Sequence, residues 1–138
     1  MANLKIILLR QHYEKLLTLA RKSRPIESCA ILIGLVEDDN VKVADIFPVK
    51  NINESPTSFS VSPEDIYRVY KAAEEKKMDI IAIFHSHPAS SYPSEKDLNG
   101  MTKWPIIWLI MGFDGMRAFK LVNGHELVEV EISIVDEP

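Results

Sequence analysis

The sequence is poor in cysteine and in long apolar runs. Its 138 residues include a single cysteine, Cys29, so no disulfide can form within the chain. No apolar run approaches the roughly 20 residues that a membrane-spanning helix needs. The start, MANLKIILLRQHYEK, lacks the layout of a signal peptide, because its apolar run is short and charged residues follow at once. We therefore expect a soluble, cytoplasmic protein with no membrane partner.

Clustered positive charge is also missing. The net charge is −4, and the densest basic groups lie at residues 21–24 and 76–77. Both groups fall at the ends of predicted helices, where cations suit the helix dipole. Binding to nucleic acid needs a patch or stripe of Lys and Arg. This distribution argues against nucleic acid as a partner, and the oligomeric state, a homodimer included, stays open.

Hydrophobic residues make up 46% of the chain, enough for the core of one domain, which we predict over residues 1–138. Apolar periodicity and turn signals divide the chain into alternating elements. Helices are predicted near residues 13–24, 62–77 and 94–101. Strands are predicted at residues 27–36, 41–49, 78–87, 106–113, 116–122 and 126–135. The fold class is α/β, with a mixed, largely antiparallel β-sheet flanked by helices.

The predicted helix at 62–77 begins after a Ser-Pro pair that suits an N-cap and a first helical position. Ile66, Val69, Tyr70 and Ala73 recur at helical spacing. We expect these four side chains to form its apolar face.

Two histidines close the strand predicted at 78–87, in the motif His85-Ser86-His87-Pro88. Residues two apart in a strand project from the same face, so His85 and His87 can reach one ion together. Neutral imidazole is a good zinc ligand. Taken alone the motif is weak, because two histidines can also be satisfied by hydrogen bonds in a core.

Ser94 and Asp97 stand three residues apart at the start of the short predicted helix. The spacing is typical of a capping box. If the preceding loop folds this helix back over the histidines, Asp97 also becomes a third ligand. Three protein ligands leave one position for water, which is the arrangement of a catalytic zinc site.

Glu27 opens a strand that is otherwise apolar. It is either a solvated carboxylate or, beside a zinc site, the group that moves a proton. Cys29 shares its strand parity, and we expect a buried, small apolar residue there. Its use as a fourth ligand of a structural zinc is the lesser alternative.

Together these residues resemble the JAMM (MPN+) metalloprotease family in its minimal prokaryotic or archaeal form. The match comprises Glu27, His85-Ser86-His87-Pro88 and Ser94-x-x-Asp97, within the segments PIESCAILIG and PVKNINESPTSFSVSPEDI. The resemblance implies an MPN-type, cytidine-deaminase-like architecture. One departure is the loop at residues 89–93, which is one residue shorter than in most members and bears on where Ser94 and Asp97 lie.

The resemblance also implies a role for each residue. His85, His87 and Asp97 are the expected zinc ligands, Glu27 the general acid/base, and Ser94 the donor to the oxyanion. The implied activity is hydrolysis of an amide or isopeptide bond at the C-terminus of a ubiquitin-like modifier. Two alternatives stay open: a peptidase that processes a ubiquitin-like sulfur carrier, and a metal-free scaffold without catalysis.

Overall fold

The structure is a computed structural model that describes residues 4–137. Helices and strands alternate along the chain without a repeating βαβ rhythm. Their bounds are β1 (Lys5–Leu9), α1 (Arg10–Ser23), β2 (Cys29–Glu37), β3 (Asn40–Val49), α2 (Pro63–Glu75), β4 (Asp79–Ser86), α3 (Glu95–Lys103), β5 (Ile107–Gly112), β6 (Gly115–Val122) and β7 (Glu126–Val135). Every helix and strand predicted from the sequence is present, and the predicted α/β class is confirmed. None of the helices in residues 4–137 is long and apolar enough to cross a membrane.

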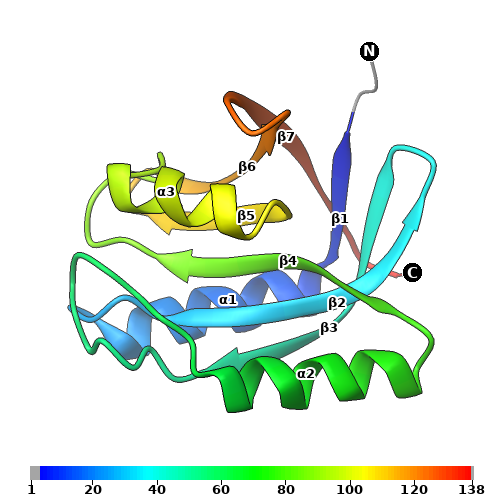
Figure 1. Ribbon diagram of the computed structural model, residues 1–138, viewed down its shortest axis with the longest axis horizontal. Helices are drawn as coiled ribbons and strands as arrows, with labels where there is room; N and C mark the ends of the chain where they lie inside the picture. The colour runs from blue at the N-terminus through cyan, green and yellow to red at the C-terminus, as the bar shows by residue number, and fades with distance from the viewer. Residues whose placement is uncertain (1–3, 138) are drawn as a thin grey trace.

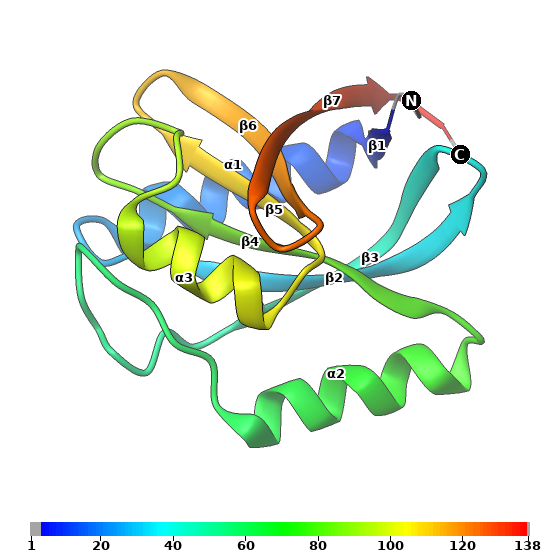
Figure 2. The same ribbon diagram turned by 45° about the horizontal axis from the view of Figure 1, so that its top comes forward.

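The strands form one closed sheet in the order β1-β3-β2-β4-β5-β6-β7 (Figures 1 and 2). Strand β2 pairs antiparallel with β3 and β4, and β6 pairs antiparallel with β5 and β7. Strands β4 and β5 run parallel, as does β1 with both of its neighbours. The sheet is therefore mixed and largely antiparallel, as predicted.

Closure of the sheet depends on β1, for which the sequence pattern gave no element. This strand is only five residues long, so its alternation is too short to stand out. Its side chains alternate in burial, with Ile6 and Leu8 fully buried. Its position between β3 and β7 joins parts of the chain far apart in sequence.

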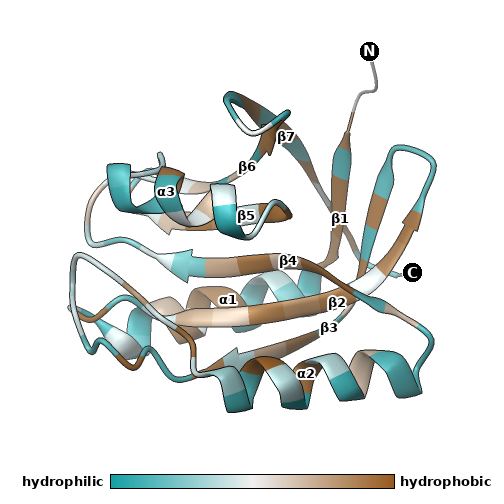
Figure 3. Ribbon diagram, in the orientation of Figure 1, coloured by the Kyte–Doolittle hydropathy of each residue, from teal (hydrophilic) through white to brown (hydrophobic). Residues whose placement is uncertain are grey.

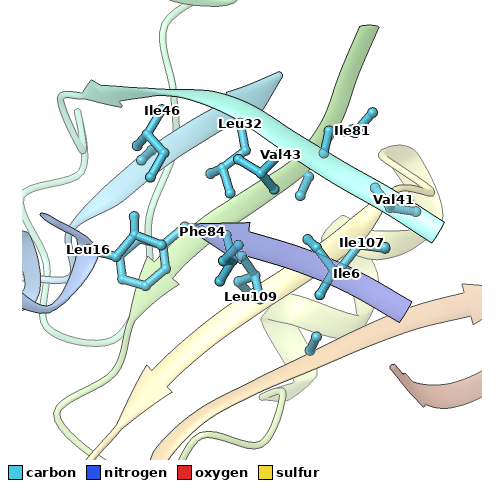
Figure 4. Close-up of a cluster of buried hydrophobic side chains, with 14 of the residues drawn as sticks. Ile6, Leu16, Leu32, Val41, Val43, Ile46, Ile81, Phe84, Ile107 and Leu109 are labelled. Atoms are coloured by element: carbon cyan, nitrogen blue, oxygen red, sulfur yellow. The ribbon is translucent and has the colours of Figure 1, made fainter. Parts of the chain in front are cut away.

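Helices cover the sheet on both faces. Helix α1 packs Leu16 and Ala20 onto a core that includes Leu32 and Phe84 (Figure 4). Helix α2 packs on Ile31 and its neighbours, and α3 packs through Met101 on β4 and β5. The central strands β2 and β4 are apolar for most of their length (Figure 3), because helices cover both of their faces. In the second half of β4, Ala82 and Phe84 pack in the core that contains α1, whereas Ile83 packs with Met101 of α3.

The apolar face predicted for α2 is too wide by one residue. Val69 and Ala73 are buried and Ile66 is partly buried, but Tyr70 is 54% exposed. Tyr70 lies about 100° further around the helix than Val69. Helix α2 buries only a narrow stripe against the sheet, so Tyr70 falls outside it.

Candidate metal centre

The carboxyl end of β4 carries both histidines. His85 is the last but one residue of β4, and His87 lies just beyond the strand, which ends one residue earlier than predicted. The backbone N–H of His87 still donates to the carbonyl of Met111 on β5, at 2.8 Å. The two Nε2 atoms lie 3.0 Å apart, so the rings converge as the strand parity predicts.

Asp97 reaches both rings from the first turn of α3. Its Oδ1 lies 3.1 Å from Nε2 of His85, and its Oδ2 lies 2.9 Å from Nε2 of His87. The capping box is present as well. Ser94 Oγ accepts from the N–H of Asp97 at 3.1 Å, and Asp97 Oδ2 accepts from the N–H of Ser94 at 2.9 Å. The cap therefore orients the same carboxylate that faces the histidines.

The second ring nitrogen of each histidine has a different environment. His87 Nδ1 lies 2.9 Å from the carbonyl of Ser90. Because a carbonyl only accepts, this nitrogen carries the hydrogen, and Nε2 is left facing Asp97. His85 is fully buried, stacks on Phe59 with ring centroids 4.4 Å apart, and meets Trp108 edge-on. Its Nδ1 has no partner within residues 4–137.

Glu27 lies beside the histidines but before β2, one position outside the strand that was predicted to begin with it. Its N–H donates to the carbonyl of Ser55 at 2.9 Å. Its side chain is buried, and a carboxylate oxygen lies within 4.8 Å of ring nitrogens of His85 and His87. One carboxylate oxygen, Oε1, has no hydrogen-bond partner in the described part of the chain.

Asn51 ties the loop before α2 to Glu27. Its Nδ2 donates to the carbonyls of Glu27 and Ser58, at 2.9 and 3.0 Å. Its Oδ1 accepts from the N–H groups of Asn53 and Ser60. All four bonds of one buried amide are used, so the loop is fixed against the backbone of Glu27. No pattern in the sequence assigned a role to Asn51, although the segment that contains it carried the resemblance.

A pair of serines joins the start of β2 to the end of β4. Ser28 N–H donates to Ser86 Oγ at 2.9 Å, and Ser86 N–H donates to the carbonyl of Ser28 at 3.0 Å. The two hydroxyls lie 2.8 Å apart, and both residues are buried. Ser28 follows Glu27, and Ser86 lies between the histidines. The clasp therefore sets the register of the carboxylate against the rings.

Burial and charge set the protonation of these groups. Burial raises the pKa of Glu27 to about 7; nearby Asp97 adds to the rise and His87 opposes it. Burial also lowers the pKa of His85, which favours the neutral ring. For Asp97 burial would raise the pKa, but the contacts with both histidine rings and the hydrogen bond from the N–H of Ser94 outweigh it and hold the pKa well below its usual range. For His87 burial would lower the pKa, but its contacts with Asp97 and with the carbonyl of Ser90 outweigh burial, so the pKa is raised. An ionised carboxylate and a neutral imidazole are the forms that bind a metal.

The donor set fits a zinc ion. Nitrogen atoms of His85 and His87 and oxygen atoms of Asp97 converge at 2.9–3.1 Å from one another. Catalytic zinc is held by three such ligands. Glu27 also lies close, with its ligand atom and those of His85 and His87 all within 4.8 Å of one another. Cys29 is fully buried, as predicted, with Sγ against the carbonyl of Val49, and it is not in the cluster found within the described residues.

A cleft of about 720 Å³ lies against Asp97, between α3 and the segment before α2. Its walls are apolar, and basic side chains lie along α3. The apolar lining includes Phe59, Val61, Ile66 and Trp104, and the basic side chains are Lys96 and Lys103. Of the residues around the histidines, Asp97 and Trp108 line this cleft.

Residues 9–122 match the family described as prokaryotic homologs of the JAB domain. The chain belongs to this family. The predicted resemblance to minimal prokaryotic JAMM proteins is thereby confirmed.

Several relatives of this JAB-domain chain have names that describe an activity. The chain is 33% identical to the desampylase of Pyrococcus furiosus over 130 residues, which is 93% of this chain and 90% of that protein. It is 34% identical to a probable TtuB-protein conjugate cleaving protease of Thermus thermophilus, over 64% of this chain and 61% of that one. A CysO-cysteine peptidase of Mycobacterium bovis is 25% identical, over 86% of this chain and 83% of its own.

A solved structure shares the fold of this JAB-domain chain. The solution structure of protein DSY2949 from Desulfitobacterium hafniense superposes with a TM-score of 0.85 at 27% identity. The match covers 96% of this chain and 94% of that one. The fold described above is therefore shared along almost the whole length of both chains.

Proposed function

We propose that the chain is a zinc-dependent peptidase that cleaves the bond after the C-terminus of a ubiquitin-like modifier. The proposal rests on one observation: the Asp97 carboxylate meets both His85 and His87 at Nε2, with the buried carboxylate of Glu27 beside them. In this proposal the two histidines and Asp97 hold the ion. When bound, zinc acts as a Lewis acid that acidifies water and polarises a carbonyl.

Glu27 is the proposed proton carrier. Its raised pKa, about 7, suits a group that must both accept and release a proton near neutrality. It takes the proton of the attacking water and later delivers it to the departing amine. The buried Oε1 makes no hydrogen bond within residues 4–137, so no existing bond of this atom opposes the transfer. Asn51 and the Ser28–Ser86 clasp keep the carboxylate in place during both steps.

Ser94 is the proposed donor to the oxyanion. Its Oγ already accepts from the N–H of Asp97, which uses a lone pair but not the hydroxyl hydrogen. That hydrogen is free to be donated, since Ser94 is exposed next to the cluster. Capping and oxyanion stabilisation are therefore compatible roles of one hydroxyl, despite the short 89–93 loop.

The proposed substrate class is drawn from the names of two relatives. The Thermus protein is named for cleaving protein conjugates of TtuB, which favours an isopeptide-type bond. The Mycobacterium peptidase is named for a bond between CysO and cysteine, which favours processing of a sulfur carrier as the second candidate. The complete donor set argues against a metal-free scaffold.

The test uses the protein with and without zinc and two substrates that share one ubiquitin-like modifier. One carries the modifier on a lysine side chain, and the other carries a single C-terminal cysteine. Release of the modifier only with zinc is expected, and the preferred substrate selects between the two candidates. A zinc-loaded protein that cleaves neither substrate, with modifiers from several organisms, would contradict the proposal.

A further inference from the structure

The loop between His87 and α3 is held by the turn that joins β5 to β6. Residues 87–94 have no helix or strand. The N–H of Phe113 donates to the carbonyl of Ala89 at 3.0 Å, and the N–H of Ser91 donates to Oδ1 of Asp114 at 2.8 Å. The turn therefore fixes the path of a loop that has no regular structure of its own.

One peptide group in this loop lies between His87 and Asp114. Its carbonyl, from Ser90, faces His87 Nδ1 at 2.9 Å, and its N–H, from Ser91, donates to Asp114. The two ends of a trans peptide point in opposite directions, so this single group links the imidazole to the carboxylate. Hydrogen bonds in a chain polarise one another, and an ionised acceptor makes a stronger bond. The Asp114 carboxylate thus strengthens the carbonyl that accepts from His87.

Gly112 packs against the same peptide group. A Cβ at this position would lie 2.4 Å from both the carbonyl carbon of Ser90 and the nitrogen of Ser91. Real Cβ atoms essentially never come this close to another atom. The backbone of Gly112 is not in the left-handed region, so glycine is needed here for space. Any larger residue must push the 90–91 peptide away.

We propose that Asp114 and Gly112 are positioning residues, which fix the ring of His87 through the 90–91 peptide. Neither residue belongs to the histidine cluster. Carboxylates commonly hydrogen-bond the free nitrogen of a metal-binding histidine and so fix the tautomer of the ring; here one peptide group relays that effect. The inference rests on the proposed function in treating His87 as a zinc ligand, while the hydrogen-bond chain exists without the ion.

Two readouts test the inference. In the metal-free protein, NMR with ¹⁵N-labelled histidine reports the hydrogen-bonded Nδ1 proton of His87. In the loaded protein, competition with a chelator reports zinc affinity. Asp114→Ala and Gly112→Ala should each lose the Nδ1 proton signal and weaken zinc binding about 10-fold or more, the range known for residues behind metal ligands. Asp114→Asn keeps an acceptor for Ser91 and should restore much of both.

Phe113→Ala is the matched control. Phe113 lies in the same turn, its side chain is 77% exposed, and alanine keeps the N–H that binds Ala89. Both readouts should stay close to wild type. The inference is overturned if Phe113→Ala has the same effect as Asp114→Ala, or if Asp114→Ala keeps the Nδ1 signal and zinc affinity. If wild type binds no zinc but only Asp114→Ala and Gly112→Ala lose the signal, the positioning role stands and the proposed function fails.

Discussion

The two histidines of the candidate centre lie two residues apart and are held in different ways. His85 is fully buried between Phe59 and Trp108, and its Nδ1 makes no hydrogen bond within residues 4–137. His87 lies past the end of β4, and its Nδ1 faces the carbonyl of Ser90. One ring is oriented by packing and the other by hydrogen bonds.

The difference follows from where the backbone is fixed. At His85 the strand is paired with β2 on one side and β5 on the other. The sheet therefore sets the direction of the Cβ, and aromatic contacts need only limit rotation of the ring. His87 has left the strand, so its direction depends on a loop. The ring of His87, on the loop, is oriented by a hydrogen bond, whereas packing contacts are enough to orient the ring of His85 on the strand.

Removing either ring should have the largest effect. His85→Ala and His87→Ala should each reduce bound zinc from about one ion per chain to nearly none, because two ligands make a weak site. Elemental analysis after dialysis measures this. His125→Ala is the matched control, since His125 is exposed in the turn after β6. If a variant with both His85→Ala and His87→Ala kept full zinc occupancy, the two rings would not be zinc ligands.

Glu27→Gln should have the next largest effect. It separates a role in proton transfer from a role in zinc binding. Glutamine keeps the shape but cannot carry the proton, so kcat should fall about 10²- to 10⁴-fold, with zinc content unchanged. Both histidine environments should be intact in the NMR spectrum. If Glu27→Gln instead lost zinc, Glu27 would itself be a ligand, positioned by the loop at residues 51–60.

Substitutions of Ser94, which ends the loop after His87, test whether this residue acts on the substrate. Ser94→Ala should lower kcat about 10²- to 10³-fold as a lost oxyanion donor and destabilise the fold by about 0.5–2 kcal/mol as a lost cap. Ser94→Asn keeps the cap and still offers a donor, so it should recover stability and part of the rate. Thermal unfolding and kcat are measured on the same samples. A rate that follows stability alone, and recovers with excess zinc, would leave Ser94 as a cap only.

Phe59→Ala should have the smallest effect and tests the packed side directly. An aromatic pair contributes about 0.5–1.5 kcal/mol beyond burial, so zinc affinity should fall by roughly two- to twelve-fold. The signal of the His85 ring should change, while that of His87 should not. Val61→Ala, in the same segment and also lining the cleft, is the control. Equal shifts of both rings would show that the two environments are not independent.

Much of the candidate site could be anticipated because its signals are local. The shared face of His85 and His87 follows from strand parity, and the cap at Ser94 and Asp97 follows from a spacing of three residues. The burial of Cys29 follows from a continuous apolar run. The role of each residue in catalysis stays a prediction until the variants above are measured.

Other features could not be read from the chain. The order of the closed sheet depends on β1, whose five residues carry too short a pattern. The exposure of Tyr70 depends on how narrow a stripe α2 buries. The contact of Phe59 with His85 joins residues from separate elements, and no periodicity links their positions.

The sequence by itself determined which side chains of the site share a face and which segments form most of the helices and strands, because these depend on backbone geometry over a few residues. It also fixed the kinds of donor atoms available for a metal. Only the tertiary structure decided that Glu27 lies beside the histidines, and that Asp114 faces the 90–91 peptide. These contacts join strands, turns and loops that meet only when the sheet closes, so their geometry depends on packing across the whole domain.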